Sequence, residues 1–266
     1  MICGVRFLLL SLFLLSGCDA FEYSPNVAFD NNSPRDINAK NLQKLLTVNN
    51  DDTIKIALTG DTQRSYEQTA AFVDKLNSIP NIDFVFLAGD ISDFGLLQEM
   101  KWVNDYYSKL KVPYFGVIGN HDRVANGKEV FINMYGPVNY SFVFDGVKFV
   151  CYDSNGRESN FDGTTPDIEW IQNELKPQAG VNNFVTVCHV PAGDGDFDPT
   201  LFVRYGKVLD TTPGLLASLN AHKHKSGVYY PYGDNIPYII TSAIQHREFT
   251  IIKIFNGQLN YEFIDY

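Results

Sequence analysis

Between residues 54 and 189, the sequence repeats one arrangement in which a short apolar run ends at a small or polar residue. The runs predicted to be β-strands lie at residues 54–58, 84–87, 114–118 and 184–188. Helical periodicity follows at residues 65–76, 96–110 and 166–175. Such alternation favours parallel strands covered by helices. Hairpin signals around Asp145-Gly146 and Asn256-Gly257 add antiparallel strands, so we expect an α/β fold with mixed sheets.

Polar side chains stand where the predicted strands end. Asp61, Asp90, Asn120 and His189 each follow the C-terminal end of an apolar strand. In open α/β sheets, ligands bind at this edge. Carboxylate, carboxamide and imidazole groups are also common metal ligands. The pattern therefore predicts a ligand or metal site, to which the neighbouring pair in Ala221-His222-Lys223-His224 would add two imidazoles.

Composition restricts the partners of this chain. Its 31 acidic and 21 basic side chains give a formal net charge of -10. We expect no nucleic-acid partner, because phosphate backbones are bound by clustered lysine and arginine. A small anionic substrate would need a local cation, such as a metal ion. Cys151 and Cys188 lie on apolar strands and are interpreted as buried apolar residues, with a disulfide as the alternative.

The N-terminus has the pattern of an export signal. One positive charge, Arg6, precedes an apolar run that is too short to span a membrane, which takes about 20 residues. Residues 1–17 are therefore interpreted as a signal peptide. Leu15-Ser16-Gly17-Cys18 resembles the bacterial lipoprotein box, so we expect Cys18 to be acylated and to anchor the exported protein in a lipid bilayer. Inner membrane, outer membrane and cell surface stay open. Residues 18–52 are predicted to be a tether, and residues 53–266 the folded domain.

Five short blocks occur in order between about residues 53 and 225: Gly60-Asp61-Thr62-Gln63, Gly89-Asp90-Ile91-Ser92-Asp93, Gly119-Asn120-His121-Asp122, Cys188-His189 and Ala221-His222-Lys223-His224. Together they resemble the calcineurin-like metallophosphoesterase superfamily, whose pattern is D-x-H, G-D, G-N-H-D/E, H and G-H-x-H. A single block is weak, but five in order at strand ends are specific. The resemblance implies a four-layer α/β/β/α sandwich with two mixed β-sheets flanked by helices.

The resemblance also implies a ligand set for two divalent metal ions, Mn²⁺ in the first place, with Fe, Zn and Mg as alternatives. Asp61, Gln63, Asp90 and His224 would surround one ion, and Asp90, Asn120, His189 and His222 the other, with Asp90 bridging. Hydroxide bound to both ions would attack the phosphorus of a phosphate mono- or diester. His121 would protonate the leaving oxygen, Asp122 would orient His121, and Asn120 and His121 would contact the substrate.

Two positions depart from the family pattern. Gln63 replaces a histidine, and its carboxamide oxygen favours oxygen-loving ions such as Mn²⁺ or Mg²⁺. Ala221 replaces a glycine and would be strained if its φ had to be positive. These departures motivate one alternative, a degenerate non-catalytic surface lipoprotein. The other alternative is a cyclic-nucleotide phosphodiesterase. The sequence gives no reason to infer a protein partner.

Several residues near the blocks are predicted to have structural roles. Asp93 and Asp153 are interpreted as turn or helix caps, Arg64 as an exposed surface residue, and His246 as structural. Tyr229-Tyr230-Pro231-Tyr232 is predicted to wall a substrate pocket, with a cover over the sheet as the alternative.

Overall fold

The computed structural model describes residues 26–47, 52–233 and 235–266. Its first sheet has the strand order β11 (Gln258–Asp265), β10 (Glu248–Phe255), β1 (Ile54–Thr59), β2 (Phe84–Ala88) and β3 (Tyr114–Val117). Strands β1, β2 and β3 are parallel, whereas β10 runs antiparallel to both β1 and β11. The predicted C-terminal hairpin thus becomes one edge of this mixed sheet.

The second sheet has the order β4 (Tyr140–Phe144), β5 (Val147–Cys151), β6 (Asn183–Val187), β7 (Leu215–Asn220), β9 (Tyr238–Ile240) and β8 (Gly227–Tyr229). Its central strands β5, β6, β7 and β9 are parallel, and the edge strands β4 and β8 are antiparallel to their neighbours. Both sheets are therefore mixed.

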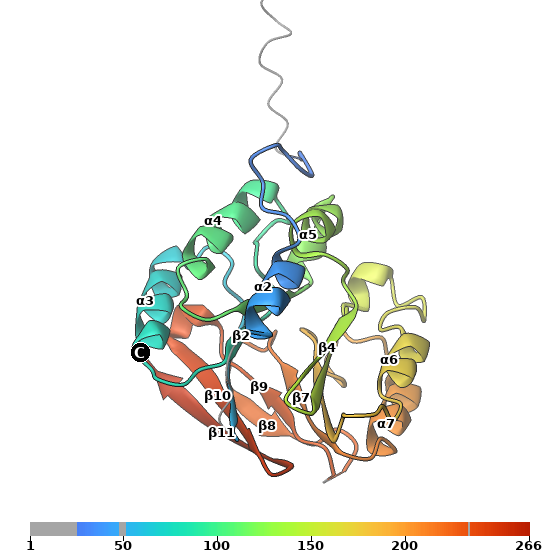
Figure 1. Cartoon of the computed structure of the whole chain (residues 1–266). Helices are drawn as coiled ribbons and strands as arrows, with labels where there is room; N and C mark the ends of the chain where they lie inside the picture. Colours follow the sequence, from blue (N-terminus) through green and yellow to red (C-terminus); the bar gives the residue numbers. More distant parts are fainter. Residues whose placement is uncertain (1–25, 48–51, 234) are drawn as a thin grey trace, which may run out of the picture.

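The described chain forms six α-helices and three short 3₁₀ turns. They are α2 (Ile37–Leu45), α3 (Tyr66–Asn77), α4 (Leu97–Tyr107), α5 (Gly127–Tyr135), α6 (Ile168–Glu174), α7 (Phe202–Asp210), η2 (His121–Arg123), η3 (Arg157–Ser159) and η4 (Ile244–His246). Helices α3, α4 and α5 pack on the first sheet, and α6 and α7 on the second. Figure 1 shows α3 and α6 on opposite sides of the molecule. The expected four-layer α/β/β/α sandwich is confirmed.

The two sheets pack face to face through an aromatic core. The Phe84 ring lies 5.3 Å from both Phe86, on its own strand, and Phe149 of the other sheet. All five residues of β2 are buried, because one face contacts helices and the other contacts the second sheet. This packing fixes how the C-terminal ends of strands from the two sheets meet.

Helix α2 closes the edge of the first sheet. The Asn38 side chain accepts from the Gly116 backbone N–H at 2.8 Å and donates to the Gly116 carbonyl at 3.0 Å, as a neighbouring strand would. Leu45 is fully buried in the core between the sheets. Of the segment predicted to be a tether, residues 26–47 are thus packed onto the domain. The predicted signal peptide and Cys18 lie outside the described residues. Among those described, no helix is both long and apolar enough to span a bilayer.

Candidate metal centre

The five sequence blocks meet where the two sheets face each other. Asp61, Asp90 and Asn120 follow β1, β2 and β3 of the first sheet, while His189 and His222 follow β6 and β7 of the second. Both sheets therefore contribute polar side chains from the C-terminal ends of parallel strands. The structure brings together all the residues predicted to surround the two ions.

Backbone geometry at this site is unusual. Positive φ angles occur at Asp61, Gln63, Asp90, His222 and His224, with values from 41° to 72°. Residues other than glycine adopt this conformation only at a cost, and such residues cluster at functional sites. Ala221 is not among the positive-φ residues of the described chain, so the strain considered for it falls on the two histidines that follow.

Two glycines let the strand ends approach closely. A Cβ atom at Gly89, whose φ is +89°, would lie 2.5 Å from Nδ1 of His189. A Cβ at Gly119 would lie 2.0 Å from the backbone nitrogen of Asp90. The glycines of these two blocks are therefore required by the space that the ligand residues occupy.

His189 is fully buried and presents one ring nitrogen to the site. Its Nδ1 lies 2.7 Å from the Ala88 carbonyl oxygen, which accepts only from an N–H. Its Nε2 then faces Asp90 Oδ1 at 3.3 Å and Asn120 Oδ1 at 3.1 Å. A histidine fixed through one nitrogen by a backbone carbonyl is the usual arrangement of a metal ligand.

His222 faces the same point from the opposite side. Its Nδ1 lies 3.1 Å from Asn120 Oδ1 and 3.3 Å from His189 Nε2. Its backbone N–H donates to Asp61 Oδ2 at 3.1 Å, which holds the loop against β1. The other ring nitrogen, Nε2, points outward to Asp194 Oδ1 at 3.3 Å and Asp196 Oδ2 at 3.7 Å.

The surroundings of Asp61 Oδ1, at the centre of the site, show whether a cation would fit there. Asp61 Oδ1 is buried and accepts no hydrogen bond within the described chain. The nearest ring nitrogens are His224 Nε2 at 3.2 Å and His189 Nε2 at 3.9 Å. A buried carboxylate oxygen that faces only ring nitrogens, at 3.2 and 3.9 Å, is weakly satisfied by protein groups, whereas a divalent cation would satisfy it. The residues present therefore fit a metal centre.

Two groups of described side chains bring possible ligand atoms together around the proposed centre. Asp61, Asp90 and His189 bring ligand atoms within 4.8 Å of one another, and Asp194, Asp196 and His222 do the same. His222 links the groups, because its two ring nitrogens face one group each.

The charge on His189 balances the buried carboxylates of the site, and bound cations would replace it. Burial opposes ionisation of Asp90, but the charge of His189 lowers the pKa of this carboxyl to about 2. Burial likewise opposes charge on His189, but Asp90 and Asp61 raise its pKa to about 10. The imidazolium thus balances the carboxylates, a task that bound cations would take over as the proton leaves. Burial and His189 lower the pKa of His222, which favours its neutral, metal-binding form.

Gln63 lies beside the predicted bridging carboxylate. Its side-chain Nε2 donates to Asp90 Oδ2 at 3.3 Å. A 180° rotation of the terminal carboxamide would exchange its oxygen and nitrogen and present Oε1 to the site instead. Gln63 is therefore placed where the sequence predicts a ligand, and the carboxamide already contacts Asp90.

His121 is held by a different residue from the one predicted. Its Nδ1 lies 2.8 Å from the backbone oxygen of Asp93 and 3.7 Å from Asp93 Oδ1. The Asp122 carboxylate instead accepts from the backbone N–H groups of Ile91, Ser92 and Gly119 at 2.8–3.1 Å. The prediction that Asp122 holds the His121 ring is thus wrong: Asp122 ties the ends of β2 and β3 together, and Asp93 orients the ring.

Asp122 is a buried structural carboxylate in this arrangement. Burial, reinforced by the charge of Asp90, raises its pKa to about 6. His121 itself is more open, with 40% of its side chain exposed. Its backbone N–H donates to Asp90 Oδ1 at 3.0 Å, so the backbone of His121 is tied directly to the proposed metal centre.

One prediction about a neighbouring residue changes. Asp93 binds Arg64 Nε at 3.0 Å through Oδ2 and faces His121 through Oδ1, so it is more than a turn cap. Tyr229 and Tyr232 donate to the carbonyls of Ala192 and Phe202, and the Tyr232 ring packs at a tilt against Phe202 of α7. Tyr232 thus covers the second sheet, whereas the Tyr229 ring lies 6.0 Å from Lys223 Nζ in the His222 loop, so the predicted pocket wall stays a prediction.

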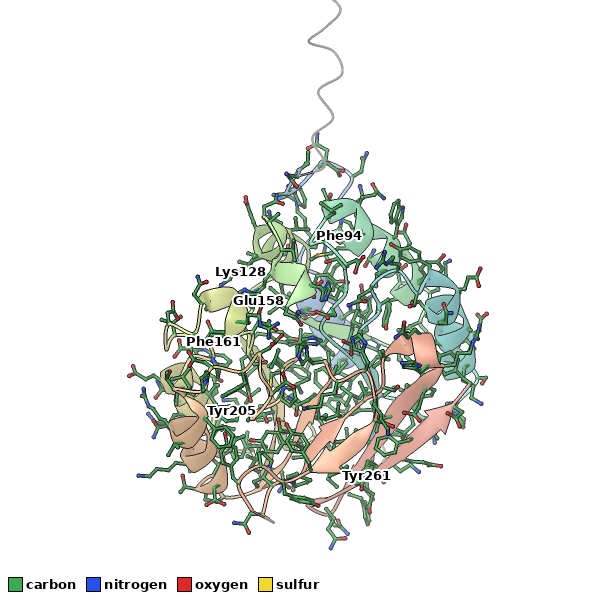
Figure 2. All side chains as sticks on the ribbon, turned by 180° about the vertical axis from the view of Figure 1, so that it is seen from behind. Phe94, Lys128, Glu158, Phe161, Tyr205 and Tyr261 are labelled. Carbon is green, nitrogen blue, oxygen red and sulfur yellow. The ribbon has the colours of Figure 1, made fainter. Side chains whose placement is uncertain are left out.

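The remaining predictions near the site are simple to place. Arg64 is exposed, as expected, although it binds Asp93. Cys151 and Cys188 are buried and free, so their interpretation as apolar residues is confirmed. His246 lies in the short turn η4, not in a strand. In Figure 2, Tyr205 of α7 lies well away from Phe94, which follows Asp93 in the loop before α4.

With this geometry in place, comparison with known proteins identifies the family. The model of the calcineurin-like phosphoesterases matches residues 54–226, well over half of the chain. The protein belongs to this family, which implies phosphate-ester substrates and a general phosphoester hydrolase activity.

A curated relative and several solved structures are similar to this chain. The relative, a probable glycerophosphodiester phosphodiesterase GpdQ from Arcobacter nitrofigilis, is 26% identical over 125 residues, which cover 45% of this chain and 46% of the relative. The match thus spans less than half of that protein. A dimetal phosphatase from Danio rerio superposes with a TM-score of 0.66 at 11% identity, covering 81% of this chain and 98% of its own.

Two other structures share the fold at low identity. GAP50, the anchor in the inner membrane complex of Plasmodium, has a TM-score of 0.60 at 13% identity, with 81% of this chain and 85% of that chain covered. The purple acid phosphatase PPD1 from yellow lupin has a TM-score of 0.60 at 12% identity, covering 81% and 52% of the two chains. At these identities, the likeness shows the fold alone.

Proposed function

We propose that this protein hydrolyses a phosphate mono- or diester with the help of two divalent metal ions, Mn²⁺ in the first place. One observation carries the proposal: the buried Asp61 Oδ1, which accepts no hydrogen bond within the described chain, faces converging ring nitrogens, while His121 stands beside them with its own carboxylate partner. The first feature fits cations and the second fits proton transfer. Few purely structural sites would need both.

The chain's own residues would divide the ligand work between the two sheets. Asp61, Gln63 and His224 would hold one ion, and Asn120, His189 and His222 the other. Asp90, whose pKa is lowered to about 2, would stay ionised and bridge them. When bound, two such ions supply a nucleophilic water at neutral pH and neutralise the charge of the phosphoryl oxygens.

His121 would act on the leaving group. Its Nδ1 faces the backbone oxygen of Asp93, which sets an N–H at this nitrogen and leaves Nε2 for the substrate side. The Asp93 carboxylate, 3.7 Å from Nδ1, would stabilise the protonated ring. His121 would then donate its Nε2 proton to the departing oxygen as the bond to phosphorus breaks. Asn120 and His121 would both contact the phosphate ester.

A non-catalytic role is the principal alternative. GAP50 has this fold and is described as an anchor, so the fold by itself does not require hydrolysis. Gln63 in place of histidine would also suit a protein that binds one ion or none. The paired His121 and Asp93 favour hydrolysis, because a binding protein has no need of an oriented proton donor.

The relative's name favours a diester over a monoester. The similarity to a probable glycerophosphodiester phosphodiesterase lies within a 125-residue segment at 26% identity. A cyclic nucleotide is also a diester and stays as an alternative substrate. We further propose that the protein is exported and anchored to a bacterial membrane through acylated Cys18.

Metal counting followed by turnover tests the proposed function. The protein is loaded with Mn²⁺, desalted and analysed for ions per chain, beside the matched Asp90→Asn variant. About two ions per chain, together with hydrolysis of bis-p-nitrophenyl phosphate or p-nitrophenyl phosphate that Asp90→Asn lacks, would support the proposal. A folded chain without ions or turnover would favour the non-catalytic alternative.

A further inference from the structure

The outward face of His222 is enclosed by two carboxylates that the sequence blocks do not include. His222 Nε2 lies 3.3 Å from Asp194 Oδ1 and 3.7 Å from Asp196 Oδ2. Both carboxylates come from the loop that follows His189, on the same sheet as His222. The ring is therefore contacted on one side by proposed ligands and on the other by acids.

Each of these acids is fixed by a cation and by the backbone. Asp194 Oδ2 binds Lys223 Nζ at 2.9 Å, and Asp194 Oδ1 accepts from the Asp196 backbone N–H at 3.0 Å. The Asp196 side chain contacts the Arg157 guanidinium, and the two residues are also joined by a backbone hydrogen bond of 3.0 Å. The carboxylates are thus held in place, with their charges compensated.

This arrangement selects one tautomer of His222. A carboxylate only accepts hydrogen bonds, so Asp194 requires the proton to be on Nε2. The lone pair of the neutral ring is then on Nδ1, which faces Asn120 Oδ1 and His189 Nε2. The other tautomer would direct the Nε2 lone pair at two carboxylates, which repel it.

We propose that Asp194 is a positioning residue that fixes the tautomer and orientation of His222 for metal binding. The inference rests on the proposed metal centre and deepens it. Asp196, at the longer distance, adds a weaker contact of the same kind. Both acids already bind a cationic side chain, and this favours a supporting role over an ion of their own between Asp194, Asp196 and His222.

Metal affinity in the full chain tests this role directly. Free Mn²⁺ is followed by electron paramagnetic resonance during titration of the wild type and of Asp194→Asn, a variant of nearly the same shape. We expect one of the two ions to bind about 10–100-fold more weakly in the variant, as is typical when the partner of a ligating histidine is lost, and the other ion to be little affected. Asp196→Asn should give a smaller loss and serves if Asp194→Asn does not fold.

A double-mutant cycle separates positioning from general damage. With His222→Ala already present, Asp194→Asn should weaken Mn²⁺ binding no further, since the ring that Asp194 positions is gone. Asp162→Asn is the matched control, because this exposed carboxylate of a neighbouring loop accepts hydrogen bonds from the backbone N–H and the hydroxyl of Thr164, and its loss should leave both ions unchanged.

Different results would overturn the positioning role of Asp194 for different reasons. Equal loss from Asp194→Asn with and without the His222 imidazole would overturn the positioning role, as would unchanged affinity in the single variant. An ion that survives Asp90→Asn and is then removed by Asp194→Asn would show that the acids bind metal themselves, which also overturns it. A wild type that binds no Mn²⁺ would overturn the proposed function together with this inference.

Discussion

Two histidines of the site, His121 and His222, each have an aspartate beside one ring nitrogen but face different tasks. Asp93 faces His121 and binds Arg64, and Asp194 faces His222 and binds Lys223. In both cases a carboxylate connects the imidazole to an exposed cation. The difference lies at the other ring nitrogen: that of His222 converges with proposed ligands, whereas His121 is 40% exposed, against 16% for His222.

The comparison shows how one local device can serve two functions. An aspartate behind the imidazole, through its backbone oxygen at His121 and its carboxylate at His222, fixes the ring and sets the position of its proton. If the free nitrogen points at other ligands, the result is a metal ligand; if it is accessible to the substrate, the result is a proton donor. Burial of the free nitrogen, and not the carboxylate, therefore distinguishes the proposed roles.

The largest effect should come from Asp90, the residue that both halves of the site share. Asp90 contacts His189 and Gln63 and accepts the His121 backbone N–H. We expect Asp90→Asn to lose both ions and to reduce turnover to background, because the bridging charge is gone. Elemental analysis after desalting measures this. An unchanged metal load would refute the bridging role, and with it the shared centre on which the comparison depends.

Alanine at the two histidines should separate their tasks. His121→Ala is expected to lower kcat by about 10²–10⁴-fold, the usual contribution of a general acid, while keeping two ions. His222→Ala should instead lose or weaken one ion, and added Mn²⁺ should restore part of its turnover. Metal counts and kcat measured on both variants decide. Metal loss in His121→Ala would break the distinction.

Much of this site can be predicted from the sequence because its proposed ligands lie at the C-terminal ends of strands. Asp61, Asp90 and Asn120 each end a strand with a recognisable apolar pattern, and parallel strands bring their C-terminal ends to one edge. The hairpins around Asp145-Gly146 and Asn256-Gly257 are also confirmed. Where the local pattern sets the position of the residue, the prediction holds.

The aspartates that contact His121 and His222 could not be predicted from the local sequence pattern. Asp122 is adjacent to His121 in sequence, but the turn η2 directs its carboxylate toward backbone N–H groups at the ends of β2 and β3. Asp93, 28 residues away in sequence, reaches the ring instead. Asp194 lies in a segment rich in glycine, proline and aspartate, a composition that indicates only a turn.

Within the domain predicted at residues 53–266, helices α5 and α7 were not predicted, because each contains a glycine that tertiary packing requires. Helix α7 contains Gly206 and valines, which lower helix propensity. A Cβ at Gly206 would lie 2.2 Å from the Tyr232 ring, so this glycine is needed for tertiary packing against a residue 26 positions later. Helix α5 likewise begins with Gly127, where a Cβ would lie 2.3 Å from the Asp122 carbonyl oxygen.

Asparagine at Asp93 or at Asp194 should have a smaller effect on turnover or metal affinity than alanine at the histidine that each aspartate contacts. We expect Asp93→Asn to lower kcat by about 10–100-fold without changing the metal load, because His121 loses the charge that stabilises its protonated form. The loss should be smaller for p-nitrophenyl esters, whose leaving group needs little protonation, than for alkyl esters. Asp194→Asn should show the reverse pattern, with metal affinity lowered. Equal dependence of both variants on the leaving group would contradict the division of tasks.

The smallest effect should come from Gln63→His, which restores the histidine of the family pattern. Gln63 now donates to Asp90 Oδ2, and imidazole is a stronger ligand than carboxamide for Zn²⁺ and similar ions. We expect tighter Zn²⁺ binding, by about tenfold or less, and little gain for Mn²⁺, measured by competition with a chelator. Gln63→Ala is the matched control, because it removes the carboxamide without adding a ligand. If Gln63→His and Gln63→Ala change Zn²⁺ affinity equally, residue 63 does not reach the ion, and the ion that Asp61 and His224 would hold then has one ligand fewer than the ion that His222 would hold.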